Sequence, residues 1–241
     1  MQKVIQAGNS FYPEWLSIIE LCVALTFLKI LHKFAGIVGL HTYNAIVVCI
    51  ANIEVLHVTK YELLSTPVPL GTILFTTTFI ANNIIADKYG NSYARKSVYL
   101  SFLVYTFFSI SLIISIMHNP FVDESVFLQQ AFLNHESMMR LFVPSLRILV
   151  ASLVAFLCGQ LFNISVFRKI RCIKTPWFSL LEYLGIFLAG LLDNIVFSSI
   201  AFYFLASPAL SLSLLLNGYI IPSCIIRFII ILLCMTMFKM R

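Results

Sequence analysis

Long apolar stretches alternate with short polar segments along the chain. Seven of these stretches contain 17 or more residues, and a helix needs about 20 mostly apolar residues to cross a bilayer. They are Trp15–Leu31, Gly36–Leu56, Val68–Ala86, Ser97–Met117, Leu141–Asn163, Ser179–Ala206 and Leu210–Phe238. The longest gap between them has 23 residues, which is too short for a soluble domain. The sequence therefore predicts an all-α, polytopic membrane helix bundle that forms one domain.

The composition agrees with this pattern. Of the 241 residues, 60% are hydrophobic and 11% are charged, and the mean hydropathy is +0.96. Soluble domains are about 45–50% apolar and roughly 25% charged. The chain is therefore expected to have the lipid bilayer as its solvent.

The basic residues predict an orientation, because cytoplasmic loops of membrane proteins are enriched in Lys and Arg. Three loops and the C-terminal tail carry Lys29, Lys33, Lys88, Arg95, Lys96, Arg168, Lys169, Arg171, Lys174, Lys239 and Arg241, whereas the alternate positions carry only Lys3, Lys60 and Arg140. We therefore expect a multi-pass protein of a bacterial inner membrane, with the C-terminus in the cytoplasm and the N-terminus outside. The net charge of +6 is mostly this topological signal, so no nucleic-acid partner is expected.

Motif searches exclude several classes of protein. The chain has no GxxxxGK[ST], HExxH, GxSxG or GxGxxG pattern, so it lacks the usual signatures for nucleotide phosphates, catalytic zinc, a serine nucleophile and dinucleotides. The histidines and cysteines are scattered, without metal-ligand spacing. We expect no cofactor, no metal site and no enzymatic activity.

Ionisable residues inside the apolar stretches are the strongest functional signal. A charge at the centre of a membrane helix costs at least about 2.5–3.5 kcal/mol on insertion scales, which makes it a candidate site by default. Arg147 and Asp193 lie within the fifth and sixth stretches, and we expect them to pair. Arg227, in the seventh stretch, is the other arginine so placed. The alternative for each polar residue is an interhelical hydrogen bond, worth about 0.6 kcal/mol on average.

The third stretch carries a polar face. Thr72, Thr76, Asn83 and Asp87 follow one another at spacings of 4, 7 and 4 residues, which places them on one side of a helix. We expect this side to face the bundle interior, with Asp87 at the cytoplasmic end. The complete set of candidate substrate-binding residues is Asn52, Asn83, Asp87, Arg147, Gln160, Asn163, Asp193 and Arg227.

Three segments resemble a known family. The first runs from Pro69-Leu70-Gly71 to Asn83-Ile84-Ile85-Ala86-Asp87-Lys88-Tyr89-Gly90, the second is Arg147-Ile148 with Gly159-Gln160-Leu161, and the third is Leu192-Asp193-Asn194 with Val196-Phe197. Their order and spacing are similar to those of the queuosine precursor transporters. Asn83 stands where that family usually has an aspartate, Asp87 replaces a glutamate, and Asn163 replaces an aspartate.

The resemblance implies a six-helix transporter core at residues 36–241, preceded by an extra transmembrane helix at residues 1–35. It also implies that the substrate is a deazaguanine base, such as queuine or its cyano and aminomethyl relatives. Such a ring presents N–H donors on one edge, which a carboxylate accepts, and a carbonyl to which an amide or arginine can donate. We expect Asp193 to accept from the donor edge and Arg147 to orient Asp193 or meet the carbonyl.

Four hypotheses follow. The first is a stand-alone secondary carrier, in one form coupled to protons through Asp193 or Asp87, and the second is a substrate-binding subunit that depends on a separate ATP-driven module. The third is an intramembrane enzyme, for which the sequence lacks a suitably spaced nucleophile and base. The fourth is a membrane scaffold whose polar residues only join helices. The sequence leaves the oligomeric state open.

Overall fold

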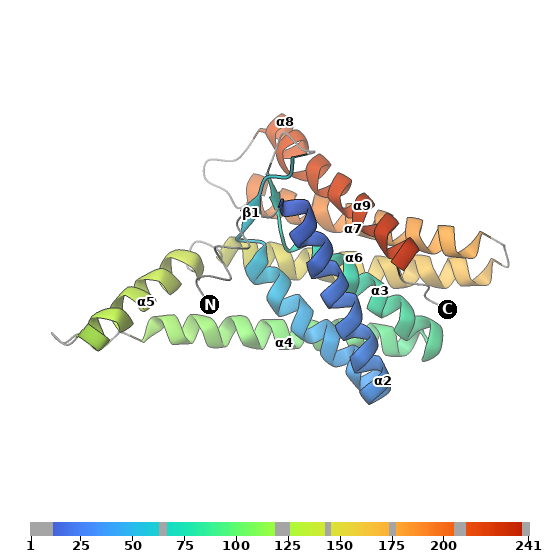
Figure 1. Ribbon diagram of the computed structural model, residues 1–241, viewed down its shortest axis with the longest axis horizontal. Coiled ribbons are helices and arrows are strands. Elements are labelled where there is room, and N and C mark those ends of the chain that lie inside the picture. Colours follow the sequence, from blue (N-terminus) through green and yellow to red (C-terminus); the bar gives the residue numbers. More distant parts are fainter. Residues whose placement is uncertain are drawn as a thin grey trace.

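The computed structural model describes residues 12–62, 67–118, 126–142, 146–173, 177–204 and 211–237, and almost all of them are helical (Figure 1). In chain order the elements are α2 (Pro13–Glu54), β1 (Val58–Thr59), β2 (Val68–Pro69), α3 (Thr72–Lys88), α4 (Asn91–Met117), α5 (Val126–Phe142), α6 (Leu146–Cys172), α7 (Phe178–Ser198), η1 (Ser199–Phe204), α8 (Leu212–Leu215), η2 (Leu216–Ile220) and α9 (Ile221–Met237). The segments η1 and η2 are π-helical. In the described part of the chain, five helical stretches are long and apolar enough to cross a membrane. The protein is therefore an all-α, multi-pass membrane protein.

Helix α2 contains the first two predicted stretches and reverses direction between them. Gly36 has φ 55° and ψ −128°, outside the helical range, and a residue with a Cβ rarely adopts such angles. Beyond this corner, Gly39 lies directly against the backbone carbonyl of Leu31. In Figure 1 the two halves of α2 form a V whose closed end is at the lower right.

The first half of α2 packs on the rest of the bundle. Leu21, Leu25 and Leu28 are almost fully buried and belong to the same hydrophobic cluster as Ile231 and Cys234 of α9. At the open end of the V, Ser17 and Tyr61 share a hydrogen bond of 2.9 Å between their hydroxyl groups. The N-terminal helix is thus part of the packed structure.

Helix α3 is the central helix of the bundle. Every residue from Thr72 to Ala86 is buried, so Thr72, Thr76 and Asn83 of the predicted polar side face the interior. Asp87, at the end of that side, is 43% exposed. Helix α3 has 17 residues and is shorter than each of the five spanning stretches. Packing against α2, α4, α6 and α9 encloses it.

The later predicted stretches differ in detail from the structure. The segment before the fifth stretch forms helix α5, which projects from the bundle at the left of Figure 1. Helix α6 begins at Leu146 and continues to Cys172, beyond the predicted end at Asn163. The sixth and seventh stretches, which are long enough to break, contain the π-helical segments η1 and η2.

Three basic segments meet at one end of the bundle. The Tyr89 hydroxyl lies 3.4 Å from His32 Nε2, which joins the turn after α3 to the closed end of the α2 hairpin. Arg171 Nη2 lies 3.4 Å from Asp87 Oδ1, which joins the same turn to the end of α6. The loops that carry most of the lysines and arginines are therefore on one face, as a positive-inside topology requires.

Candidate functional site

A pocket lies among the end of α2 and helices α3, α6, α7 and α9, and its lining includes Asp193 and Arg227. The other lining residues are Val55, Pro69, Thr72, Phe75, Ser152, Ala155, Asn194, Phe197, Ser198, Tyr219 and Ser223. Ligand pockets in proteins combine apolar walls with a few polar groups. The lining of this pocket has that character.

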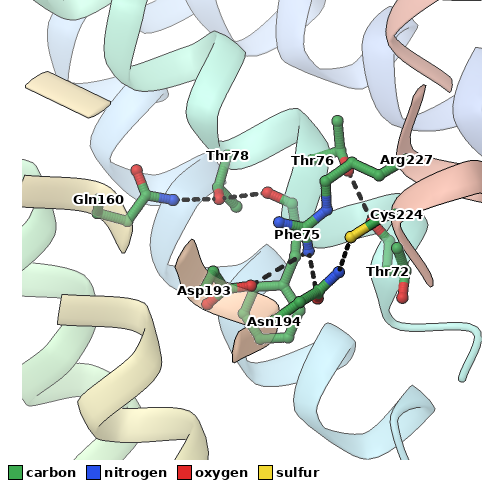
Figure 2. Close-up of polar contacts among 9 residues, drawn as sticks. All are labelled: Thr72, Phe75, Thr76, Thr78, Gln160, Asp193, Asn194, Cys224 and Arg227. Carbon is green, nitrogen blue, oxygen red and sulfur yellow. Dashed lines mark hydrogen bonds and ion pairs between the residues drawn. The ribbon is translucent and has the colours of Figure 1, made fainter. Parts of the chain in front are cut away.

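The polar centre of the pocket is an ion pair between α7 and α9. Arg227 Nη2 donates to Asp193 Oδ2 at 3.1 Å and to Asn194 Oδ1 at 3.3 Å, and Figure 2 shows the guanidinium group reaching across to both residues. Asn194 Nδ2 in turn donates to Cys224 Sγ at 3.7 Å. Arg227 is 1% exposed and Asp193 is 8% exposed, so the pair is screened from bulk solvent.

The ion pair leaves hydrogen-bonding capacity unused. Arg227 Nε and Nη1 are buried and have no hydrogen-bond partner among the described residues. The hydroxyl oxygen of Ser152, also in the pocket lining, is in the same situation. A buried donor or acceptor without a partner costs about 1–3 kcal/mol, so a ligand that bonds to these groups would be stabilised by them.

Arg227 packs directly against Gly190, where any residue with a Cβ would overlap the arginine. A Cβ at Gly190 of α7 would overlap the Cδ and Nη1 atoms of Arg227. On its other side, the Arg227 guanidinium carbon lies 5.7 Å from the centre of the Phe79 ring, within range of a cation–π interaction. The arginine is thus held between α7 and α3.

Aromatic side chains line the rest of the pocket. Phe202 of η1 and Tyr219 of η2 stack with ring centroids 4.5 Å apart, and Phe197 contacts Phe202 edge to face. Tyr219 and Phe197 also belong to the lining. π-helical turns are frequent at functional sites, and here η2 carries Tyr219 of the lining while η1 carries Phe202, which stacks on it.

Three predicted site residues belong to a separate amide network around α3. Asn82 Nδ2 donates to Gln160 Oε1 at 2.7 Å, and Gln160 Nε2 donates to Thr78 Oγ1 at 2.6 Å. Asn163 Nδ2 donates to Asn83 Oδ1 at 2.8 Å. Gln160, Asn83 and Asn163 are therefore bonded across helices and do not line the pocket. Thr78 donates to the carbonyl of Phe75 at 2.7 Å, which links the network to the pocket wall (Figure 2).

The remaining predicted site residues lie elsewhere. Asp87 is at the basic end of the bundle, paired with Arg171 and 43% exposed. Asn52 lines a second hollow. Arg147 is in the first turn of α6, but its side chain lies outside the described residues, and the basic partner that the structure gives Asp193 is Arg227.

Several pocket residues were not among the sequence-based candidates, namely Ser152, Asn194, Phe197, Tyr219 and Ser223. A helical spacing could have indicated some of them, because Tyr219, Ser223 and Arg227 follow one another at intervals of four. Asn194 and Ser198 show the same interval beside Asp193. Residues four apart lie on one face of a helix.

Comparison with known proteins gives a consistent assignment. A "Probable queuosine precursor transporter" of Bacillus subtilis is 27% identical over 223 residues, which cover 89% of this chain and 88% of that protein. A protein of the same name from Haemophilus influenzae is 29% identical over 138 residues, covering 57% of this chain and 53% of that protein, about half its length. The model of the family described as "Putative vitamin uptake transporter" matches residues 69–240. The chain belongs to the queuosine precursor transporter family. No solved structure matches it with statistical significance.

Family membership confirms the resemblance seen in the sequence motifs. The family match at residues 69–240 includes α3, α6, α7 and α9. It therefore contains both residues of the buried ion pair and most of the pocket around them.

Proposed function

We propose that this chain imports a deazaguanine precursor of queuosine, and that the pocket around Asp193 and Arg227 is its substrate site. The observation that carries the proposal is the buried ion pair, which retains unused hydrogen-bonding groups beside a pocket whose lining includes aromatic side chains. Ionisable residues inside membrane-spanning helices are costly, which makes them functional-site candidates by default.

The chemistry of the ring matches the groups in the pocket. Arg227 occupies Oδ2 of Asp193, so Oδ1 is the carboxylate oxygen that accepts from the N–H and amine edge of the base. Ser152 and Arg227 line the same pocket and have buried donors without a partner among the described residues, and we assign these donors to the ring carbonyl. Phe197 and Tyr219 provide flat apolar surfaces against which the ring can stack.

We assign structural roles to the remaining polar residues. The amide network of Gln160, Asn83 and Asn163 joins α3 to α6. The pair formed by Asp87 and Arg171 closes the basic end of the bundle, which we assign to the cytoplasm of a bacterial inner membrane. The two halves of α2 would then be the extra helix and the first helix of a six-helix core.

We further propose that the chain works as a stand-alone secondary carrier. Its described residues form a single bundle with one buried carboxylate–arginine pair at the pocket, and a buried carboxylate can carry a proton with the substrate. Coupling to protons would therefore run through Asp193.

Uptake in a defined host tests the proposal. The host should lack precursor synthesis and its own precursor importer, and should contain the enzyme that inserts queuine into tRNA. We expect labelled queuine to enter tRNA saturably only when this chain is expressed, and we expect Asp193→Asn to reduce uptake at least about tenfold at equal membrane expression. A matched variant, Asp87→Asn, should retain uptake. Equal uptake by the wild type and Asp193→Asn would overturn the assignment of the site.

A further inference from the structure

A second hollow lies between the end of α2, the middle of α4 and the start of α6. Its lining includes Asn52, Leu56, Tyr105, Phe108, Ile113 and Leu149. Its residues on α2 lie near the C-terminus of that helix. The Gly36 corner and the basic loops are at the other end of the second half of α2.

Asn52 is the polar group of this hollow that lacks a partner. Its Nδ2 donates to the Val48 carbonyl at 2.8 Å, whereas its Oδ1 is buried without a hydrogen-bond partner among the described residues. The residue is 7% exposed. Because an unsatisfied buried acceptor is costly, the hollow favours a ligand that donates a hydrogen bond.

The walls around Asn52 favour a flat ligand. Tyr105, Phe108 and Phe142 contribute three aromatic rings, and Tyr105 is 5% exposed. The Ser109 hydroxyl, also in the lining, already donates to the Tyr105 carbonyl at 2.8 Å. The ligand that fits is an aromatic ring with an N–H or amine donor, whereas a lipid acyl chain has no donor for Asn52.

The two hollows are lined by neighbouring turns of the same two helices. Val55, directly after α2, and Ser152 of α6 line the substrate pocket, while Asn52 and Leu149, each three residues earlier, line the second hollow. A ring that moved from one hollow to the other would stay between α2 and α6.

We propose that the second hollow is an outer waiting site, where Asn52 accepts a hydrogen bond from the deazaguanine base before the base reaches Asp193. This inference rests on the proposed function. It assigns to Asn52 a capture step that is separate from binding by the ion pair.

Equilibrium binding of labelled queuine to the purified full chain in lipid nanodiscs tests the inference. We expect two binding components in the wild-type protein. Asp193→Asn should remove one, and Asn52→Leu should weaken the other about tenfold, which corresponds to about 1.4 kcal/mol, because the substitution removes the acceptor. Ile113→Trp, which fills the hollow from α4 and leaves Asn52 in place, should weaken the same component.

The component that depends on Asp193 serves as an internal control for folding in the Asn52 and Ile113 variants. If it persists and the isotherms of both variants match the wild type, the waiting site is refuted and the hollow holds lipid or nothing. If the wild type binds no queuine at all, the proposed function fails and this inference with it. A single wild-type component lost with Asp193→Asn would support the function and refute the waiting site.

Discussion

Arg227 and Asp193 form an ion pair across α9 and α7, with 3.1 Å between Nη2 and Oδ2 and nearly complete burial of the arginine. A buried pair of this kind adds little net stability, because desolvation offsets the attraction, but removal of one partner leaves an uncompensated charge. The pair is therefore better explained by substrate recognition than by stabilisation of the bundle.

We therefore predict that substitutions of Asp193 and Arg227 have strongly coupled effects on the free energy of unfolding. We expect Asp193→Leu and Arg227→Met each to destabilise the protein by about 3–5 kcal/mol, and the double variant to be destabilised by clearly less than the sum. Thermal unfolding of the four proteins in detergent measures this double-mutant cycle. Additive effects would show that the two side chains do not interact.

Gly190 provides a test of how Arg227 is held. A Cβ at position 190 would overlap the arginine, so Gly190→Ala should displace the guanidinium group and lower queuine uptake at least about tenfold. Gly185→Ala is the matched control on the same helix, where the added Cβ meets only the ends of the flexible side chains of Val166 and Ile170. Similar uptake by the two variants would contradict the placement of Arg227.

The amide network should contribute to stability more than to substrate affinity. Gln160→Leu leaves Asn82 without its acceptor, so we expect a loss of about 1–3 kcal/mol and a lower melting temperature. The affinity of the remaining folded protein for queuine should stay within about threefold of wild type. Ser165→Ala, at an exposed position of the same helix, is the control. A large loss of affinity with an unchanged melting temperature would instead place Gln160 in contact with the substrate.

The corner at Gly36 should tolerate no side chain. Its positive φ makes Gly36→Ala unfavourable by about 1–3 kcal/mol, whereas Gly218→Ala adds a Cβ that meets nothing within 4 Å. The melting temperatures of the two variants should therefore differ by several degrees. Equal melting temperatures would mean that the α2 hairpin does not depend on this corner.

The sequence predicted the helical class and the family well, because long apolar runs and spaced motifs are local features. It also singled out Asp193 as a candidate, since a carboxylate deep in an apolar stretch is conspicuous, and the structure places this residue in the buried ion pair. It did not predict the partner of Asp193: both Arg147 and Arg227 lie in apolar stretches, and which one reaches α7 depends on how the helices pack.

Other features required the three-dimensional arrangement. Gln160, Asn83 and Asn163 could have faced either a substrate or each other, and the structure pairs them within the network around α3. Helix α5 escaped prediction because its polar residues, such as Glu136 and Arg140, interrupt the apolar pattern of a spanning helix, even though the two form an i, i+4 pair.

Uptake by the purified protein in liposomes tests the central claim most directly, because no other protein is present. We predict saturable uptake of labelled queuine by the wild type and by Asp87→Asn, uptake that a proton gradient enhances, and a loss of at least about tenfold in Asp193→Asn at equal protein content. Unimpaired uptake by Asp193→Asn would contradict the account of the site. Binding of queuine without uptake by the wild type would contradict the stand-alone carrier and indicate an energising partner.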